Sequence, residues 1–166
     1  TIRRYLDLLT DAFMIRQLQP YHANLKKRQV KSPKIFVRDS GLLHQLLGID
    51  SMNSLYSHPK VGASWEGFVI EQILMMESHD EIFFWATHQG AEIDLILRRG
   101  DALYGVECKR ADTPRLTPSI RIALDDLKLK HVFVIYPGIQ RFPLASQVEA
   151  VPLQALSKGV SLLDEF

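Results

Sequence analysis

The sequence predicts a mixed α/β fold in which a helix, three strands, a helix and a strand follow one another. Three stretches carry this prediction. Residues 91–109 alternate acidic and apolar side chains, as two strands of a hairpin do. Residues 64–77, before that hairpin, place apolar side chains at helical spacing. Residues 132–136 are wholly apolar, as expected for a strand buried on both faces of a sheet.

The first forty residues predict a helix followed by a basic hairpin. Residues 1–12 form an amphipathic pattern, and residues 14–19 and 34–38 predict two strands joined by a basic turn at 22–31. This is the outline of the second half of a winged-helix unit, which commonly meets phosphates through cationic side chains. The alternative is a solvated loop or a protein contact. The candidate nucleic-acid-binding residues are Arg3, Arg4, Lys26, Lys27, Arg28 and Lys31.

Charge divides the chain into two parts. Residues 1–40 carry nine Lys or Arg and three Asp or Glu, a balance of +6, whereas the whole chain of 166 residues has a net charge of only +1. Short helices are expected at 41–47, where Ser40 is the cap, and at 51–56. Pro59 and Gly62 then mark a connector. We therefore expect a partial winged-helix-like segment and connector at 1–60 and a second domain at 61–166.

The helix at 64–77 is expected to carry one inward-facing carboxylate. Ser64 is a suitable N-cap, and Glu66 falls at the edge of the apolar stripe, whereas Glu71 points away from it. A glutamate in the first helical turn is also common simply because the helix dipole favours its charge. The apolar stripe consists of Trp65, Phe68, Val69, Ile73 and Met76.

The hairpin at 91–109 follows a strand at 81–87. If Arg99 and Gly100 form a two-residue turn, Asp94 faces Gly105, and Glu107 lies one diagonal step away. In this interpretation Asp94 shares a face with Glu92 and Ile96. Diagonal partners are about 7 to 8 Å apart, which allows two carboxylates to converge on one cation. The alternative is a solvated face on which Lys109 pairs with a carboxylate.

The C-terminal third completes the sheet. Pro118 near the start and apolar positions at helical spacing predict a helix at 119–128 before the strand at 132–136. Residues 148–153 predict an edge strand, because Pro152 cannot donate a ladder hydrogen bond. A final helical turn is expected at 153–156.

Composition excludes several classes of protein. Hydrophobic residues make up 46% and charged residues 23% of the chain, as in an ordered globular protein. The sequence contains no apolar run of membrane-spanning length. The single Cys108 excludes an internal disulfide, and a cytoplasmic location is expected. Because the chain begins at Thr1 inside a predicted helix, we expect it to be a piece of a longer protein.

The motif residues resemble the PD-(D/E)XK nuclease superfamily, which places one Asp on a strand and Glu-X-Lys on the next. Asp94 and the run Glu107-Cys108-Lys109 match these positions, and Glu66 matches a glutamate often found on the preceding helix. Ile93 replaces the motif proline. More narrowly, residues 31–43, 65–69, 91–97 and 106–109 resemble the uncharacterised domain found C-terminal to prokaryotic AAA-type ATPases, although Gly67 replaces a frequent Asn.

The resemblance implies a restriction-endonuclease-like α-β-β-β-α-β core, preceded by a truncated winged-helix-like segment. It also implies an N-terminal P-loop ATPase domain in the same polypeptide. This chain contains no Walker A pattern of its own.

The implied chemistry is Mg²⁺-dependent, or Mn²⁺-dependent, hydrolysis of nucleic acid, with DNA as the first substrate to consider. Asp94, Glu107 and Glu66 would be the metal ligands, and Glu92 would be a reserve ligand. Lys109 would orient the attacking water or stabilise the developing negative charge. The catalytic residues would thus be Glu66, Asp94, Glu107 and Lys109.

Two other functions fit the same residues. A catalytically silent module could bind nucleic acid or a partner and regulate the ATPase domain. Alternatively, the acidic face could be a scaffold of ion pairs in an oligomerisation element, so that a second copy of the chain would be the partner.

Overall fold

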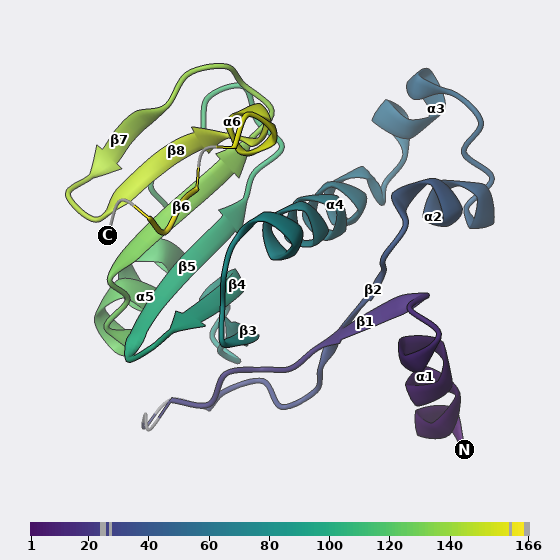
Figure 1. Ribbon diagram of the computed structural model, residues 1–166, viewed down its shortest axis with the longest axis horizontal. Helices are drawn as coiled ribbons and strands as arrows, with labels where there is room; N and C mark the ends of the chain where they lie inside the picture. Colours follow the sequence, from purple (N-terminus) through teal and green to yellow (C-terminus); the bar gives the residue numbers. More distant parts are fainter. Residues whose placement is uncertain (24–25, 27, 160, 165–166) are drawn as a thin grey trace.

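The computed structural model describes residues 1–23, 26, 28–159 and 161–164, and confirms the mixed α/β class. Its centre is a six-stranded mixed sheet with the strand order β3-β4-β5-β6-β8-β7 (Figure 1). β5, β6 and β8 run parallel to one another, and the other pairs are antiparallel. The strands are β3 (Glu81–Ala86), β4 (Glu92–Arg99), β5 (Ala102–Cys108), β6 (His131–Tyr136), β7 (Phe142–Ala145) and β8 (Val148–Pro152).

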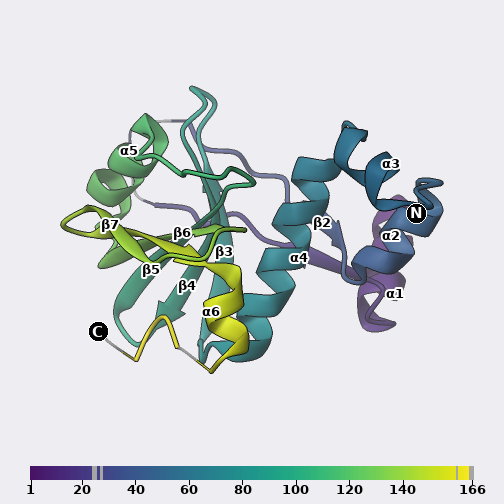
Figure 2. The same ribbon diagram turned by 90° about the horizontal axis from the view of Figure 1, so that it is seen from above.

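Helices cover both faces of the sheet. α4 (Val61–Met76) lies on one face together with the short α6 (Leu153–Ser157), and α5 (Pro118–Leu127) lies on the other (Figures 1 and 2). Val69, Ile70 and Ile73 of α4 belong to one buried cluster, and Ile120 and Ala123 of α5 belong to a second. The elements α4, β3, β4, β5, α5 and β6 thus follow one another in the predicted order.

The N-terminal segment packs beside this unit. It comprises α1 (Ile2–Asp11), β1 (Ile15–Leu18), β2 (Lys34–Val37), α2 (Ser40–Leu46) and α3 (Met52–Ser57), all at the expected positions. β1 and β2 pair as an antiparallel hairpin. Asp39 caps α2 by accepting a hydrogen bond from the backbone of Leu42, where the sequence suggested Ser40 as the cap.

Two described parts of the connection between β1 and β2, residues 19–21 and 28–30, run along the open edge of β3. The backbone N–H of Tyr21 donates to the carbonyl of Phe84 at 2.6 Å, and the N–H of Val30 donates to the carbonyl of Ala86 at 2.9 Å. The segment therefore protects the edge strand, which would otherwise offer unpaired backbone groups to other chains.

Four expectations for α4 are wrong. Glu66 is not in the first turn, and Phe68 and Met76 of the expected apolar stripe are exposed. The helix begins at Val61 after Lys60, one turn before Ser64, which is instead buried and lies 2.7 Å from Nε2 of His44. Glu71 does not point away from the packed surface. Its side chain is buried and accepts hydrogen bonds from Arg16 of β1 and from Arg38, directly after β2.

The hairpin closes one residue later than expected. Arg99 pairs with Ala102, so the turn residues are Gly100 and Asp101, and Gly100 adopts a φ of +59° that favours glycine. Ile96, and not Asp94, lies opposite Gly105. A Cβ at Gly105 would come within 2.9 Å of Leu129, so this glycine allows close packing on the α5 face and leaves no open space beside Asp94.

A β-bulge changes the face on which Asp94 lies. Phe83 pairs with Ile96 but Trp85 pairs with Ile93, so β4 contains one extra residue in this interval. Ile93 and Ile96 both join the α5-side cluster, while Leu95 joins the α4-side cluster. Asp94 consequently faces α4, whereas an unbroken alternation would place it with Ile96.

The end of the sheet also differs from expectation. β8 is an internal strand between β6 and β7, and the sequence analysis missed β7. Pro152 is tolerated because it is the last residue of β8. β6 is buried along its whole length, as predicted. No helix in the described part of the chain is long and apolar enough to cross a membrane.

Candidate metal centre

Three carboxylates meet where α4 approaches β4. Glu66 comes from α4, Glu92 and Asp94 come from β4, and one oxygen of each lies within 4.8 Å of the others. Lys34 of β2 joins them. Its Nζ lies 2.8 Å from Oε1 of Glu66 and 3.5 Å from Oδ1 of Asp94, and it also forms an ion pair with Glu92. We call these four residues the acidic site.

Local packing brings the four side chains together. Gly67 of α4 allows Phe36 of β2 to approach closely, since a Cβ at this position would lie 3.2 Å from the Phe36 ring. This contact sets β2 against α4 and brings Lys34 to Glu66. From the other side, the bulge in β4 turns Asp94 toward α4, and the backbone N–H of Cys108 donates to Oδ2 of Asp94 at 2.8 Å.

The charges in the acidic site depend on one another. Burial and the neighbouring carboxylates raise the pKa values of Glu66 and Asp94, and Lys34 only partly offsets this. Burial alone would lower the pKa of Lys34, but Glu66 and Asp94 outweigh it and raise that pKa above its ordinary value. The ammonium of Lys34 therefore stays charged in the acidic site, where three carboxyl groups surround it.

Glu107 and Lys109 form a second ion pair beside the acidic site, with Nζ of Lys109 2.6 Å from Oε1 of Glu107. The charge of Asp94 acts on both Glu107 and Lys109, so this ion pair lies within electrostatic reach of the acidic site. Its Oε2 is buried and has no hydrogen-bond partner among the described residues. Burial, followed by the charge of Asp94, raises the pKa of Glu107 to about 7.

The predicted site residues are thus brought together only in part. Glu66 and Asp94 meet as expected, but Glu92, the reserve ligand, takes the position expected of Glu107 in the group of three. Sequence reasoning missed Lys34. The spacing of Lys34 and Phe36 indicates that both side chains lie on one face of a short strand. The sequence does not indicate which helix this face approaches.

The three carboxylates fit a divalent cation. Carboxylate oxygens are the ligands that Mg²⁺ prefers, and Mg–O bonds of about 2.1 Å place two ligand oxygens at most about 4.2 Å apart. A spread of up to 4.8 Å therefore needs only a small contraction. The ammonium of Lys34 would compete for the same oxygens, so cation binding requires this side chain to move.

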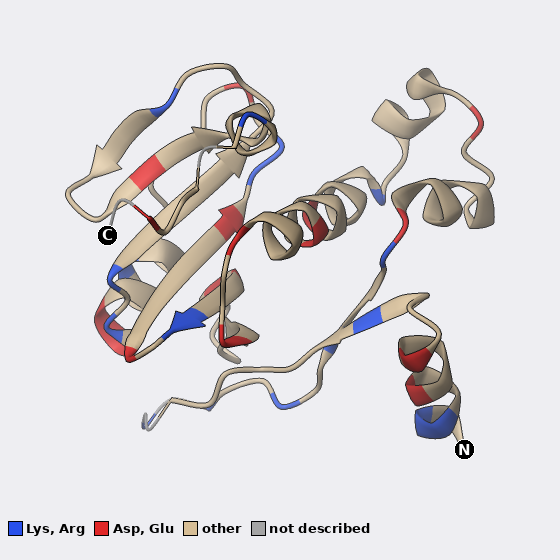
Figure 3. Ribbon diagram, in the orientation of Figure 1, with Lys and Arg blue, Asp and Glu red and all other residues tan. Residues whose placement is uncertain are grey.

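The described candidates for nucleic-acid binding are solvent-exposed. Arg3 and Arg4 lie on α1, which also carries Asp7 and Asp11, so this helix is not a purely basic surface (Figure 3). The other described candidates lie on the connection between β1 and β2, and they are Lys26, Arg28 and Lys31. Lys27 lies outside the described residues.

Comparison with known proteins places the chain among uncharacterised relatives. A family model described as "Domain of unknown function (DUF4143)" matches residues 61–156, and one described as "Domain of unknown function (DUF8612)" matches residues 1–53. Uncharacterised proteins of Mycobacterium tuberculosis and Mycobacterium bovis are each 51% identical to the chain over 160 residues. These alignments cover 96% of the chain but 36% of each relative, so the chain spans about a third of their length. No solved structure matches the chain.

Proposed function

The chain belongs to the DUF4143 family, and we propose that its part from residue 61 onward is a nuclease-like domain that hydrolyses phosphodiester bonds of nucleic acid with a divalent cation. One observation carries the proposal. One carboxylate oxygen each of Glu66, Glu92 and Asp94 lies within 4.8 Å of the others, and the next strand, β5, carries Glu107 and is followed directly by Lys109. The order α4-β3-β4-β5-α5-β6 supports a restriction-endonuclease-like core for this domain.

Each residue has a role in the proposal. Glu66, Glu92 and Asp94 hold Mg²⁺ or Mn²⁺, which when bound would neutralise a phosphodiester and lower the pKa of a coordinated water. Lys109 stabilises the negative charge that develops on the phosphate. Glu107, which the sequence suggested as a metal ligand, positions Lys109 through the ion pair at 2.6 Å. Lys34 leaves the carboxylates when the cation enters.

A nuclease assay with site variants tests this function. The chain is incubated with single-stranded DNA, duplex DNA or RNA in Mg²⁺ or Mn²⁺, and products are separated on denaturing gels. We expect Asp94→Asn to abolish cleavage, because it removes a central ligand. Lys109→Ala is expected to slow cleavage about 100- to 10,000-fold, the usual contribution of one positioned catalytic group.

Glu81→Gln is the matched control, because Glu81 lies on the neighbouring β3 and pairs with Arg98 on the surface. It should cleave at the wild-type rate. Cleavage that persists in folded Asp94→Asn and Lys109→Ala proteins would contradict the proposal. Circular dichroism establishes that each variant is folded.

A catalytically silent binding module is the second candidate, and the position of Lys34 favours it. An ammonium group already among three carboxylates acts as a built-in counter-ion, and the acidic site could then serve only to fix β2 against α4. This candidate predicts salt-dependent nucleic-acid binding in EDTA without cleavage in any metal. Binding unchanged after neutralisation of Lys26, Lys27, Arg28 and Lys31 would exclude the basic connection as the contact surface.

The longer relatives suggest where such a domain acts. Because the chain spans about a third of their length, we propose that it works within a larger polypeptide in which a P-loop ATPase domain precedes it. In that setting the ATPase would move or load nucleic acid, and this domain would cut or hold it.

A further inference from the structure

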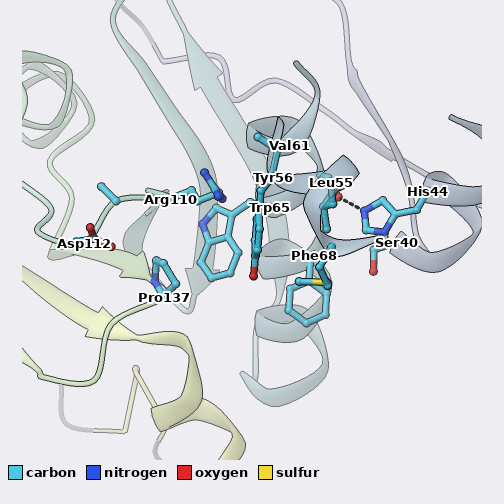
Figure 4. A pocket seen from close by; sticks show the side chains of 13 residues that line it. Ser40, His44, Leu55, Tyr56, Val61, Trp65, Phe68, Arg110, Asp112 and Pro137 are labelled. Carbon is cyan, nitrogen blue, oxygen red and sulfur yellow. Dashed lines mark hydrogen bonds between the residues drawn. The ribbon is translucent and has the colours of Figure 1, made fainter. Parts of the chain in front are cut away.

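A cavity of about 690 Å³ opens between α2, α3, α4 and the loop after β5. Its volume lies within the roughly 300 to 1,000 Å³ of small-molecule sites. Figure 4 shows Trp65 in the middle of this cavity, with Tyr56 and Phe68 on one side and Arg110, Asp112 and Pro137 on the other. We call this the aromatic cavity.

The lining combines stacking surfaces with polar groups. The Trp65 and Phe68 rings lie 6.5 Å apart at an angle of 47°, and the guanidinium of Arg110 lies 5.3 Å from the centre of the Tyr56 ring. Tyr56 is 56% exposed, so its ring is available to a ligand. Nε1 of Trp65 is a buried donor that finds no acceptor within the described part of the chain. Asp112 adds a carboxylate at the rim.

None of the four acidic-site residues lines the aromatic cavity, but two lining residues are sequence neighbours of residues in the proposed nuclease. Trp65 directly precedes Glu66 on α4, and Arg110 directly follows Lys109 after β5. A ligand that stacks in the aromatic cavity and continues past these residues would reach the carboxylates. A polymer of flat rings joined by anionic links has this shape and chemistry.

We propose that the aromatic cavity binds an unpaired nucleobase of single-stranded nucleic acid next to the acidic site. The base stacks on Trp65 and Tyr56, as bases do on aromatic side chains in single-strand binders. Arg110 contacts the adjoining phosphate, and Asp112 accepts a hydrogen bond from an exocyclic amino group. A base within a duplex cannot enter, because both of its faces are already stacked. The proposal deepens the proposed function, on which the choice of nucleic acid as ligand rests.

Fluorescence anisotropy in EDTA tests the cavity without any hydrolysis. The probe is a short fluorescein-labelled single-stranded oligodeoxycytidine, and the competitors are the same unlabelled strand and its duplex with oligodeoxyguanosine. We expect the single strand to compete at least about tenfold better than the duplex. Tyr56→Ala should weaken single-strand binding about fivefold or more, since it removes one stacking surface.

Conservative variants separate stacking from charge. Tyr56→Phe keeps the ring and should bind like the wild type, while Arg110→Gln should weaken binding and reduce its dependence on salt. Arg121→Gln, an exposed arginine on α5, is the charge-matched control and should leave the affinity unchanged. Unaltered single-strand affinity in Tyr56→Ala, or equal competition by duplex, would overturn the proposal. So would a Tyr56-dependent dimer in sedimentation, because the cavity would then be a protein interface.

The two proposals can fail independently. Asp94→Asn should retain single-strand binding, because Asp94 does not line the aromatic cavity. Single-strand binding without cleavage in any metal would overturn the nuclease proposal but not the proposal of a base-binding site. Cleavage that is unaffected by Tyr56→Ala and Arg110→Gln would overturn the base site and leave the nuclease.

Discussion

The pKa values of two buried glutamates, Glu71 and Glu107, are shifted in opposite directions. Burial opposes ionisation of Glu71, but hydrogen bonds from Arg16 and Arg38 outweigh it and hold the pKa of Glu71 below its ordinary value. Glu107 has only Lys109 as a direct partner among the described residues, and burial raises its pKa to about 7. Of these two glutamates, Glu107 is therefore the one whose charge should change near neutral pH.

The raised pKa of Glu107 predicts that the stability of the protein depends on pH. The unfolded chain releases the Glu107 proton near pH 4.5 and the native chain releases it near pH 7, so the native state binds more protons between these values. The free energy of unfolding should therefore fall as pH rises through this window, by up to about 3 kcal/mol. In Glu107→Gln the part of this loss that comes from Glu107 should be absent, so its stability should fall less steeply with pH. Urea titrations from pH 4.5 to 8 measure both proteins, and parallel curves would refute the raised pKa.

The residues of the candidate site differ in how far sequence could identify them. Asp94 and Glu107 stand out because carboxylates interrupt apolar strands, and Glu66 stands out beside an apolar helical stripe. Lys34 does not stand out, since it is one of several lysines in a basic segment. Its role depends on the contact between Phe36 and Gly67, which only the folded chain reveals.

At the scale of elements, patterns located the described helices and strands except β7, but not all of the neighbours of each strand. The hairpin was identified, yet its turn falls at Gly100 and Asp101, which moves the pairing by two positions. This error preserves the face of each residue. The bulge between Ile93 and Ile96 does not, and it arises from pairing with β3, a partner that residues 91–109 alone do not specify. The position of β8 between β6 and β7 depends likewise on long-range pairing.

The ion pairs of Glu71 should anchor the β1–β2 hairpin to α4. The Glu71 side chain is only 10% exposed and binds two arginines from this hairpin and its end. We expect Glu71→Gln to lower the free energy of unfolding by about 1 to 3 kcal/mol, the usual cost of losing hydrogen bonds to a charged group. Urea denaturation followed by tryptophan fluorescence measures the loss.

Glu81→Gln again provides the comparison, because Glu81 and Arg98 form an ion pair with side chains that are 51% and 36% exposed. Its cost should stay below about 1 kcal/mol. Equal effects of the two substitutions would show that Glu71 is no anchor.

At the scale of the whole molecule, the N-terminal segment completes the second domain. Backbone groups of residues 19–21 and 28–30 pair with the edge of β3 and the residues after it, Arg16 and Arg38 bind Glu71, and Lys34 enters the acidic site. The charge asymmetry of the sequence is thereby explained in part, since basic side chains of the first forty residues neutralise acidic ones of α4 and β4. Displacement of Lys34 by a cation would therefore change the contacts that hold β2 against α4.

Manganese binding tests the central claim, which is that Glu66, Glu92 and Asp94 form a divalent-cation site for which Lys34 competes. Electron paramagnetic resonance of free Mn²⁺ gives the affinity of the wild type, Lys34→Met, Asp94→Asn and the control Lys31→Met, whose lysine is exposed outside the site. The account predicts one site in the wild type, at least about tenfold tighter binding in Lys34→Met, which corresponds to about 1.4 kcal/mol, and no binding in Asp94→Asn. An absence of Mn²⁺ binding in both the wild type and a folded Lys34→Met protein would contradict it.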